Sequence, residues 1–447
     1  MRIEKYKLIA KIFFWTFWIC ATVPFFVQEL TNERHNEVLL SLWALGEIIF
    51  VGLGIWTLRA RVDKMIIAIF LTVSFIDTVL ANHLSVMYWI NGCRFYIAFL
   101  FIIPIFRYFW TDDTRRRYFI RRMDRLIYIY LVIQFPCMVI QFLRYGAFDN
   151  VSGSIGQMQS GNTSTIIYLA SFYLMLRRWD KNASYFKNLL NNWQLLVLLL
   201  PTFMNETKVS FIYILMYFFF LVPMDRRFLK RMIYIIPLMV VVAVGSGILY
   251  SKMVEGSKVV SLDDVSAYVV GDDQMLELVE YIFENDVIDV EETDYARGLK
   301  FMVLPMLYDR HPKAWFFGFG VSQYKGGLKL DKTDFAKRYF WMMQGCIMQW
   351  HAAMVDMGIP GGILYILFWI TVFRLWRRHK GERNLQMSWM LGLVTCIVSV
   401  YCPFMDILPI YVQYMYFVFV CSRWNELPAY QHIPLLGSKK FAFSLHD

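Results

Sequence analysis

An arginine, two histidines and several glycine turns lie along and just after the longest polar segment of the chain, from about Ser251 to Arg338. In chain order they are Arg297-Gly298, His311-Pro312, Gly318-Phe319-Gly320 and Trp350-His351. A guanidinium group can stabilise negative charge that develops on a phosphate, and a neutral imidazole can accept a proton from a hydroxyl. An apolar run follows directly, so these residues predict a site at a membrane surface for chemistry on a lipid-borne substrate.

The composition places the chain in a membrane. Hydrophobic residues make up 58% and charged residues 18% of the 447 residues, whereas soluble domains contain about 45–50% apolar and about 25% charged residues. Apolar runs of about 15 to 22 residues recur throughout, and such runs are long enough to cross a hydrocarbon core of about 30 Å as helices. Backbone groups in lipid must be hydrogen-bonded internally. The predicted fold class is therefore an all-α polytopic membrane protein.

The lengths of the apolar runs predict about twelve transmembrane helices. They are Leu8–Gln28, Val38–Leu58, Met65–Ala81, Met87–Phe106, Leu126–Leu143, Asn162–Leu176, Trp193–Met204, Val209–Val222, Met232–Tyr250, Gly358–Leu375, Leu385–Tyr401 and Ile407–Cys421. The seventh and eighth are short and are separated only by residues 205–208, so they are either two crossings or a re-entrant pair. The first lacks a small-residue cleavage site, which predicts a retained helix.

Lysine and arginine are concentrated in alternate connections between these runs, as expected for cytoplasmic loops. The connection after the fourth run carries seven arginines, at positions 107, 115, 116, 117, 121, 122 and 125, whereas Gly146–Ser160 has no basic residue. Both termini are therefore predicted to be cytoplasmic, with the long polar loop outside. This basic belt, in contact with anionic lipid, explains the net charge of +10 better than nucleic-acid binding does.

Four regions follow from this topology. Residues 1–250 hold the first nine helices, 251–357 form a folded extracytoplasmic loop with amphipathic helices, 358–422 hold the last three helices, and 423–447 form a cytoplasmic tail. Within the loop, Tyr295–Tyr308 is expected to form a helix that stops at His311-Pro312. Tyr339–Met357 is expected to form another, lying on the outer leaflet, with His351 and Val355 on one face.

Motifs for metal or nucleotide chemistry are missing from the sequence. The seven cysteines show neither zinc-site nor disulfide-framework spacing. The chain has no glycine-rich phosphate loop and no HExxH sequence,. The sequence therefore predicts no metal site and no cofactor.

The order of these features resembles the bacterial O-antigen ligase and polymerase family, which are integral-membrane C-type glycosyltransferases. The resemblance rests on Arg297, the Gly-x-Gly turn, and the histidine helix that closes with Asp356-Met357-Gly358 before a span. The turns 152–156 and 205–210 are similar to two further family segments. Lys208 stands where members usually carry the arginine of Ser-Arg-Gly, which keeps the charge but loses the guanidinium fork. Ala352 stands where asparagine commonly follows the histidine.

The resemblance implies a donor, an acceptor and a reaction. The donor would be an oligosaccharide on undecaprenyl pyrophosphate at the outer face of the bacterial inner membrane, and the acceptor a hydroxyl of another glycan, of lipid A-core or of a protein. His351 would accept the hydroxyl proton, and Arg297 and Lys208 would stabilise the leaving pyrophosphate without metal or cofactor. Membrane lipids surround the protein, and a flippase and a chain-length regulator are its implied protein partners.

Two further residues are candidates for substrate contact. Arg94 lies in the outer part of the fourth run, where a charge is costly, and is either a pyrophosphate contact or an ion-pair partner of Asp77, Glu206 or Asp406,. Trp350, next to His351, could stack on a sugar ring.

Each catalytic candidate has a structural alternative. Arg297 could pair with Asp294 or Glu292, and Lys208 could extend to the membrane interface,. His351 could be an ordinary interfacial histidine, while His311 is expected to belong to a turn because a proline follows it.

Two other functions stay open. A polymerase and a ligase share the same chemistry, and the acidic first half of the loop favours a polymerase over transfer to a charged lipid A-core. A twelve-helix flippase or other transporter matches the number of spans. Such proteins, however, are commonly built from two similar halves with binding groups near the membrane midplane, whereas the longest loop here is external and off-centre.

Overall fold

The structure is a computed structural model that describes most of the chain. It describes residues 4–31, 37–147, 149–157, 159–205, 209–222, 299–321, 349–376, 382–401 and 407–427, with short pieces between 230 and 245, at 277, and between 330 and 339. All regular elements in these residues are helices, which confirms the predicted all-α class. Lys208 and Arg297 lie outside the described residues, as does most of the polar segment from 246 to 298.

Most of the long helices contain an apolar run of the sequence, but their bounds differ from those of the predicted spans. The fifth predicted span is Leu126–Leu143, whereas its helix begins 13 residues earlier, at Asp113, so six arginines expected in a connecting loop are helical. The predicted span Trp193–Met204 is divided between two short helices. The first half of the chain forms α1 (Lys5–Thr31), α2 (Glu37–Thr57), α3 (Arg61–Phe75) continued by the π-helical η1 (Ile76–Ala81), α4 (Val86–Trp110), α5 (Asp113–Tyr145), η2 (Gly153–Ile155), α6 (Ser160–Arg178), α7 (Tyr185–Asn191), α8 (Trp193–Val197), η3 (Leu200–Phe203) and α9 (Val209–Phe220). The second half forms α13 (Leu299–Arg310), α14 (Ala314–Phe317), α16 (Gln349–Trp376), α17 (Glu382–Tyr401), α18 (Leu408–Ser422) and η4 (Trp424–Glu426).

Four of the described helices are long and apolar enough to cross a membrane, which identifies a helical membrane protein. They are Lys5–Thr31, Arg61–Ala81, Asp113–Tyr145 and Trp350–Arg374. A fifth segment is bent by 47° between its parts, Val86–Arg94 and Tyr96–Trp110. Further apolar helices among the described residues are shorter: Ser41–Thr57, Trp193–Phe203, Val209–Phe220 and Leu408–Ser422. Thus several of the twelve predicted spans correspond to helices shorter than a full crossing.

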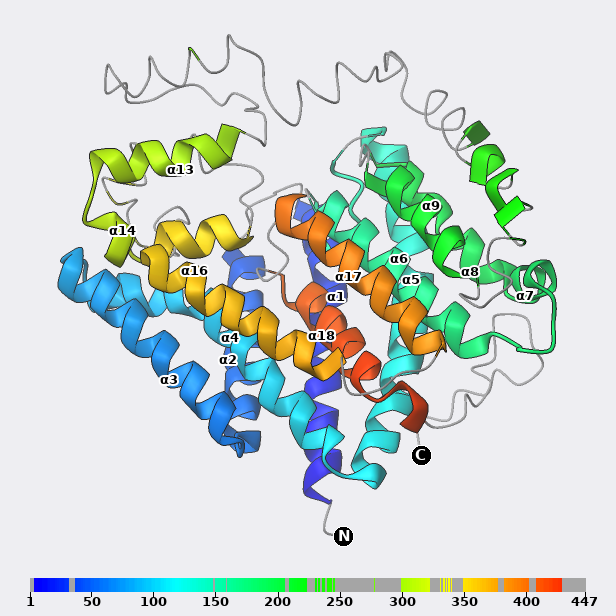
Figure 1. Cartoon of the computed structure of the whole chain (residues 1–447), viewed down its shortest axis with the longest axis horizontal. Helices are drawn as coiled ribbons and strands as arrows, with labels where there is room; N and C mark the ends of the chain where they lie inside the picture. Colours follow the sequence, from blue (N-terminus) through cyan, green and yellow to red (C-terminus); the bar gives the residue numbers. More distant parts are fainter. Residues whose placement is uncertain are drawn as a thin grey trace.

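The centre of the bundle is α18 (Figure 1), which packs against α1, α4, α6, α16 and α17. Every residue of α18 is buried. A helix that is apolar on all sides can bury its whole surface only among other helices or in lipid. Here the surrounding helices provide that burial, so a helix of about 22 Å can be accommodated although it is shorter than the hydrocarbon core.

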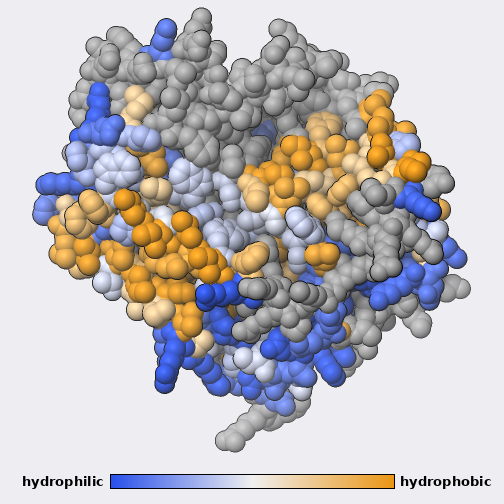
Figure 2. All heavy atoms as spheres, in the orientation of Figure 1, coloured by the Kyte–Doolittle hydropathy of each residue, from blue (hydrophilic) through white to orange (hydrophobic). Residues whose placement is uncertain are grey.

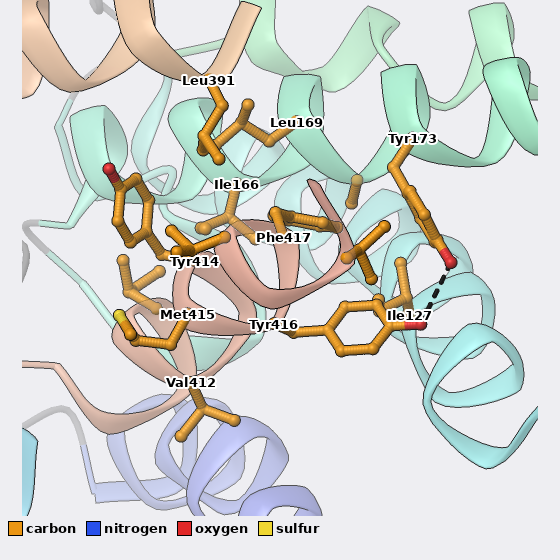
Figure 3. Close-up of a cluster of buried hydrophobic side chains, with 14 of the residues drawn as sticks. Ile127, Ile166, Leu169, Tyr173, Leu391, Val412, Tyr414, Met415, Tyr416 and Phe417 are labelled. Atoms are coloured by element: carbon orange, nitrogen blue, oxygen red, sulfur yellow. Dashed lines mark hydrogen bonds between the residues drawn. The ribbon is translucent and has the colours of Figure 1, made fainter. Parts of the chain in front are cut away.

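A buried carboxylate lies beside this apolar centre. Asp124 of α5 accepts hydrogen bonds from the hydroxyls of Tyr173 and Tyr416 at 2.6 and 2.7 Å, and Arg177 lies 3.4 Å from its other oxygen. The two tyrosines come from α6 and α18 and point toward each other (Figure 3). A charge without partners would be costly here. The shared carboxylate therefore fixes α5, α6 and α18 in one register.

The turn that carries η2 enters the bundle and is held by buried glutamines. Gln141 of α5 accepts hydrogen bonds from the backbone N–H groups of Ser152 and Gly153 at 2.9 and 2.7 Å. Gln134, also on α5, accepts one from the N–H of Ser154 at 2.8 Å. In an exposed turn these N–H groups would donate to water. In this buried turn they donate to the glutamine side chains instead, because buried backbone N–H groups need partners.

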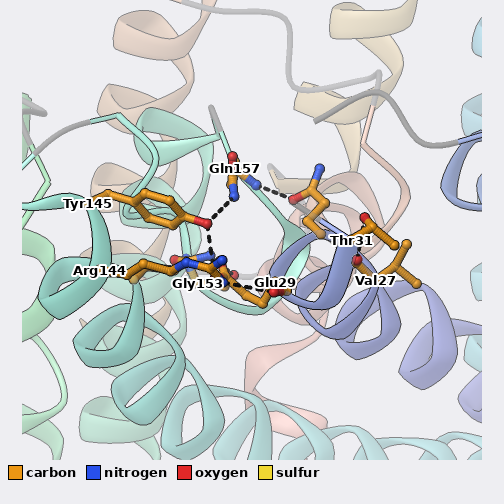
Figure 4. Close-up of polar contacts among 9 residues, drawn as sticks. Val27, Glu29, Thr31, Arg144, Tyr145, Gly153 and Gln157 are labelled. Carbon is orange, nitrogen blue, oxygen red and sulfur yellow. Dashed lines mark hydrogen bonds and ion pairs between the residues drawn. The ribbon is translucent and has the colours of Figure 1, made fainter. Parts of the chain in front are cut away.

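The same end of α5 is joined to the end of α1 by polar contacts (Figure 4). Arg144 forms an ion pair of 2.9 Å with Glu29, and the hydroxyl of Tyr145 donates to the same carboxylate at 3.1 Å. The side-chain amide of Gln157, in the η2 turn, donates to the Tyr145 hydroxyl at 3.0 Å. These contacts tie the η2 turn to both helices.

The outer surface separates apolar and polar side chains. Exposed apolar residues of α3 and α16, among them Met65, Ile69, Ile366 and Phe373, face outward. Figure 2 shows hydrophobic side chains gathered over this part of the molecule and hydrophilic ones below them, toward the start of α1. α13 and α14 lie at the opposite end (Figure 1). The surface therefore has the arrangement expected of helices in contact with lipid.

A first prediction concerns the η2 turn. Replacing Gln141 with leucine should lower the midpoint of thermal unfolding in detergent, because two buried backbone N–H groups would lose their acceptor. Each such loss typically costs about 1–3 kcal/mol. The matched control is Asn191→Leu on α7, where the side chain is exposed. Equal unfolding midpoints for the two variants would show that the glutamine does not hold the turn.

Candidate functional site

The helix that carries His351 is broken one turn before it enters the apolar layer. α16 runs through Gly358, whose backbone angles (φ 61°, ψ −150°) are not helical. Its first segment lies across the bundle and its second descends along it (Figure 1). Pro360 falls in the first turn of the second segment, where a missing N–H is tolerated. The helix thus changes direction at Gly358.

The break leaves the last carbonyl groups of the first segment without helical partners, and α13 and the Gly318–Gly320 turn supply partners. The hydroxyl of Tyr308 donates to the Met354 carbonyl at 2.9 Å. The backbone N–H of Phe319 donates to the Val355 carbonyl at 2.8 Å, and that of Gly320 to the Asp356 carbonyl at 3.0 Å. The Gly318–Gly320 turn thus caps the end of the histidine helix.

Two glycines make this close approach geometrically feasible. A Cβ at Gly318 would lie 2.5 Å from the Asp356 carbonyl, and one at Gly358 would lie 2.6 Å from the carbonyl oxygen of Trp315. Both residues also have positive φ angles, which glycine adopts without strain,. The two glycine motifs of the sequence, far apart along the chain, therefore form one interlocked structure.

On its other side, the Gly318–Gly320 turn contacts Thr78 of η1 and Asn82, the residue that follows η1. The side-chain amide of Asn82 donates to the Gly318 carbonyl at 3.2 Å, and the backbone N–H of Val321 donates to the Thr78 hydroxyl at 3.1 Å. The turn consequently joins α16 to the end of the third predicted span.

A buried carboxylate lies at this junction. Asp356 is fully buried, and the hydroxyl of Tyr96 on α4 donates to its Oδ2 at 2.6 Å. Tyr308 is close by: burial, and to a smaller extent the Asp356 charge, raises the pKa of its hydroxyl. That hydroxyl therefore stays protonated and remains a donor to α16.

His351 is enclosed by the protein, with 1% of its surface exposed. Val355, one turn further along the same helix face, is also buried. The half-buried Trp350 ring lies edge-on to the imidazole, with centroids 5.8 Å apart. His351 therefore lies inside the protein.

An apolar cleft of about 50 Å³ lies between α3, α4 and α16. Its lining residues are Phe70, Tyr96, Phe99, Leu100, Ala353, Met357, Gly361, Leu364, Tyr365 and Phe368. Tyr96 therefore borders the cleft and also bonds to Asp356. An apolar chain in this cleft would lie beside Tyr96 and its hydrogen-bond partner Asp356, at the break of α16.

Arg94 has a partner that the sequence does not indicate. Its Nε lies 2.7 Å from Oε2 of Glu47 on α2, and the carboxylate is almost completely buried. Asp77, one of its expected partners, is buried in η1; Glu206 and Asp406 lie outside the described residues. α2 and α4 pack along each other, and this packing selects Glu47. Arg94 thus balances a buried charge near the part of α4 that carries Tyr96.

The structure describes the flanks of the two remaining cation candidates. Before Lys208, the buried amide of Asn205 donates to the Ser164 hydroxyl of α6 at 3.0 Å. After Arg297, α13 begins at Leu299. Lys208 and Arg297 themselves lie outside the described residues, so their place relative to His351 stays a prediction.

His311 belongs to an aromatic cluster of the outer loop. It lies between α13 and α14, with its Nε2 3.2 Å from the Tyr339 hydroxyl and its ring edge-on to Phe319. Phe335 stacks on Phe319 with centroids 4.2 Å apart. These contacts agree with the expectation that His311 has a packing role in a turn.

Two tyrosines near the break of α16 are not indicated by the sequence. They are Tyr96, which bonds to Asp356, and Tyr308, which bonds to the Met354 carbonyl. Aromatic residues make up 18% of the chain, and neither tyrosine stands in a motif. Asp356, in contrast, closes a motif that the sequence shows. Only the tertiary contacts distinguish these two hydroxyls from the other tyrosines.

A second prediction tests the interlocked glycines. Gly358→Ala should lower the unfolding midpoint clearly, because a strained backbone costs about 1–3 kcal/mol and the added carbon would also collide with backbone atoms,. Gly52→Ala is the control, since a Cβ there has no neighbour within 4 Å and alanine favours the helix. An unchanged midpoint for Gly358→Ala would contradict the interlock.

No protein-family model matches this chain, and no curated protein matches it. The resemblance to the O-antigen ligase and polymerase family therefore rests on the motifs quoted above. The structure adds features that are independent of that resemblance: the helix break at Gly358, the Gly318–Gly320 turn, and buried histidine, aspartate and tyrosine side chains at one end of an apolar bundle.

Proposed function

We propose that the protein is a polysaccharide polymerase, acting on O-antigen, capsule or exopolysaccharide. It would transfer a glycan from undecaprenyl pyrophosphate to a hydroxyl of an acceptor sugar at the outer face of the bacterial inner membrane. The observation that carries the proposal is the capping of the His351 helix by the outer-loop turn. This contact places a buried histidine and a buried carboxylate where a folded loop meets the apolar bundle.

The proposed step is a single displacement. The acceptor oxygen forms a bond to the anomeric carbon, its proton passes to the His351 ring, and the bond between that carbon and the pyrophosphate oxygen breaks with its electrons on the oxygen. Arg297 and Lys208 stabilise the negative charge of the leaving group. Trp350 and Arg94 are the proposed contacts to glycan and pyrophosphate. No metal or cofactor takes part.

Burial of the site supports such a step in two ways. Exclusion of water strengthens the attraction between fixed cations and a developing phosphate charge, and it limits hydrolysis of the donor. The apolar cleft beside Tyr96 offers a place for the first part of a polyprenyl chain. The same donor chemistry would serve a ligase whose acceptor is lipid A-core or protein, and that alternative is kept.

The proposed topology has twelve crossings, cytoplasmic termini and the loop of residues 251–357 on the periplasmic side. It is supported by the alternation of basic connections,. The separation of α13 and α14 from the start of α1, at opposite ends of the bundle (Figure 1), is consistent with it. The active site would then face the compartment in which lipid-linked glycans are polymerised.

A third prediction tests His351. In vesicles with an undecaprenyl-pyrophosphate oligosaccharide, His351→Gln should lower turnover by about 10²–10⁴-fold, the usual contribution of a positioned acid–base group. Turnover of the unmodified protein should fall on acidification, because a protonated imidazole cannot accept a proton. The measurement is the rate of longer-glycan formation on a gel.

The control is His311→Gln, whose amide can still bond to Tyr339 and whose turnover should change little. If His351→Gln is as fast as the unmodified protein, His351 is not the base. If the donor crosses the membrane and no glycosidic product forms, the transporter alternative is correct and the polymerase proposal is wrong.

A fourth prediction concerns the proposed cations. Arg297→Ala and Lys208→Ala should each lower turnover by about 10²–10³-fold, which is typical for the loss of one charge-stabilising donor. Lys208→Arg should retain most of the activity, because the positive charge remains. Membrane content of each variant is measured by immunoblot beside turnover. Full activity of Arg297→Ala at normal content would exclude its role at the pyrophosphate.

A further inference from the structure

A cavity of about 260 Å³ lies where α2 ends, α3 begins and α4 ends. Its lining residues are Thr57, Arg59, Ala60, Asp63, Pro104, Arg107, Tyr108 and Thr111. It has room for several water-sized groups, since one water takes about 30 Å³. This end of α4 is far along the helix from Tyr96 and the outer loop, so the proposed transfer reaction does not use the cavity.

One arginine of the cavity is held in a fixed orientation. Arg107 donates from Nε and Nη2 to the two oxygens of Asp63, at 2.8 and 2.9 Å. The carboxylate is buried, whereas the arginine side chain is about a third exposed, at 31%. Because Asp63 uses only one edge of the guanidinium, the N–H groups of Nη1 remain for another acceptor.

Two more arginines flank a tyrosine in the cavity wall. The guanidinium groups of Arg59 and Arg115 lie 5.8 and 4.6 Å from the centroid of the Tyr108 ring. Contact with an aromatic ring restrains a guanidinium without neutralising its charge. Asp112 on the same side caps α5 by accepting from the backbone N–H of Arg115. Two guanidinium groups, those of Arg59 and Arg107, and a single carboxylate, that of Asp63, thus line the cavity, while Arg115 contacts the Tyr108 ring from outside the lining.

The start of α3 adds to this positive potential. Its N-cap residue, Ala60, lines the cavity and makes no side-chain capping hydrogen bond. The first N–H groups of a helix carry partial positive charge and favour a bound anion. The start of α3 and the guanidinium groups therefore both favour the binding of an anion.

An exposed apolar surface continues from the cavity along α2 and α3. Ile55, Val62, Met65 and Ile69 are 60%, 48%, 56% and 40% exposed. In Figure 2 hydrophobic side chains cover this part of the molecule, with hydrophilic ones directly below. A ligand with an anionic head and apolar chains would match both surfaces.

We propose that this cavity binds the phosphate of an anionic phospholipid headgroup, with the acyl chains along the exposed face of α2 and α3. Guanidinium groups suit phosphate because their planar N–H pairs match its oxygens. Basic cavities between membrane helices on the cytoplasmic side are suited to anionic headgroups, and the basic-loop pattern predicts that this side is cytoplasmic. A zwitterionic choline headgroup would be disfavoured, since its ammonium would lie beside the guanidinium groups of Arg59 and Arg107.

The fifth prediction tests this site. Full-length protein in neutral detergent is titrated with dioleoyl phosphatidylglycerol, and bound lipid is counted by native mass spectrometry. Arg59→Gln should weaken binding about fivefold, the effect of one arginine near a membrane surface. Arg59→Lys should weaken it less. Arg117→Gln on α5 is the matched control: Arg117 is exposed at the same end of the bundle but does not line the cavity.

Further titrations distinguish the source of the phosphate. Dioleoyl phosphatidylcholine should bind weakly and equally to all variants, and inorganic phosphate at equal concentration should not displace phosphatidylglycerol. Unfolding midpoints without lipid should be the same for the Arg59 and Arg117 variants. The proposal is overturned if Arg117→Gln weakens binding as much as Arg59→Gln, because the effect would then be general surface charge. Complete displacement by inorganic phosphate would identify a free-phosphate site instead of a lipid site.

Discussion

The carbonyl groups at the break of α16 require hydrogen-bond donors, and the arrangement around His351 depends on how they obtain them. A helix that ends inside a protein has unpaired carbonyls, and burial without partners would cost free energy at each one. Tyr308, Phe319 and Gly320 supply the donors. The segment that carries α13, α14 and the Gly318–Gly320 turn is thereby fixed to α16. The helix that carries His351 is therefore positioned by contacts both from this segment and from the bundle.

The same requirement explains the polar groups elsewhere in the bundle. Glu47 and Asp124 are buried in an apolar interior, and each has cationic or hydroxyl partners from other helices. Gln141 provides an acceptor to a turn that water does not reach. Such groups add less to stability than to specificity, because a helix that rotated or slid would leave them unpaired. The bundle is thus set in register by a small number of buried polar contacts.

The two ends of the bundle carry different charge chemistry. At the end that carries α13 and α14, a carboxylate, a histidine and the Tyr308 hydroxyl are buried beside a narrow apolar cleft. At the other end, arginines line an open cavity below an exposed apolar face. Both are places where a polar head and an apolar chain could lie together. An enzyme that takes lipid-linked substrates from the bilayer would need the first, while the second would hold the protein in the bilayer through anionic lipid.

Hydropathy and motif order in the sequence predicted the all-α membrane class, the apolar part of most of the long described helices and the glycine turn at Gly318. These features depend on residues close together in the chain. Tertiary structure alone decided that Arg94 pairs with Glu47, that His351 is buried, and that Tyr96 and Tyr308 join its helix to the rest. Apolar helix faces resemble one another in sequence, so which faces meet, and therefore which polar side chains become partners, depends on the packing of the whole bundle.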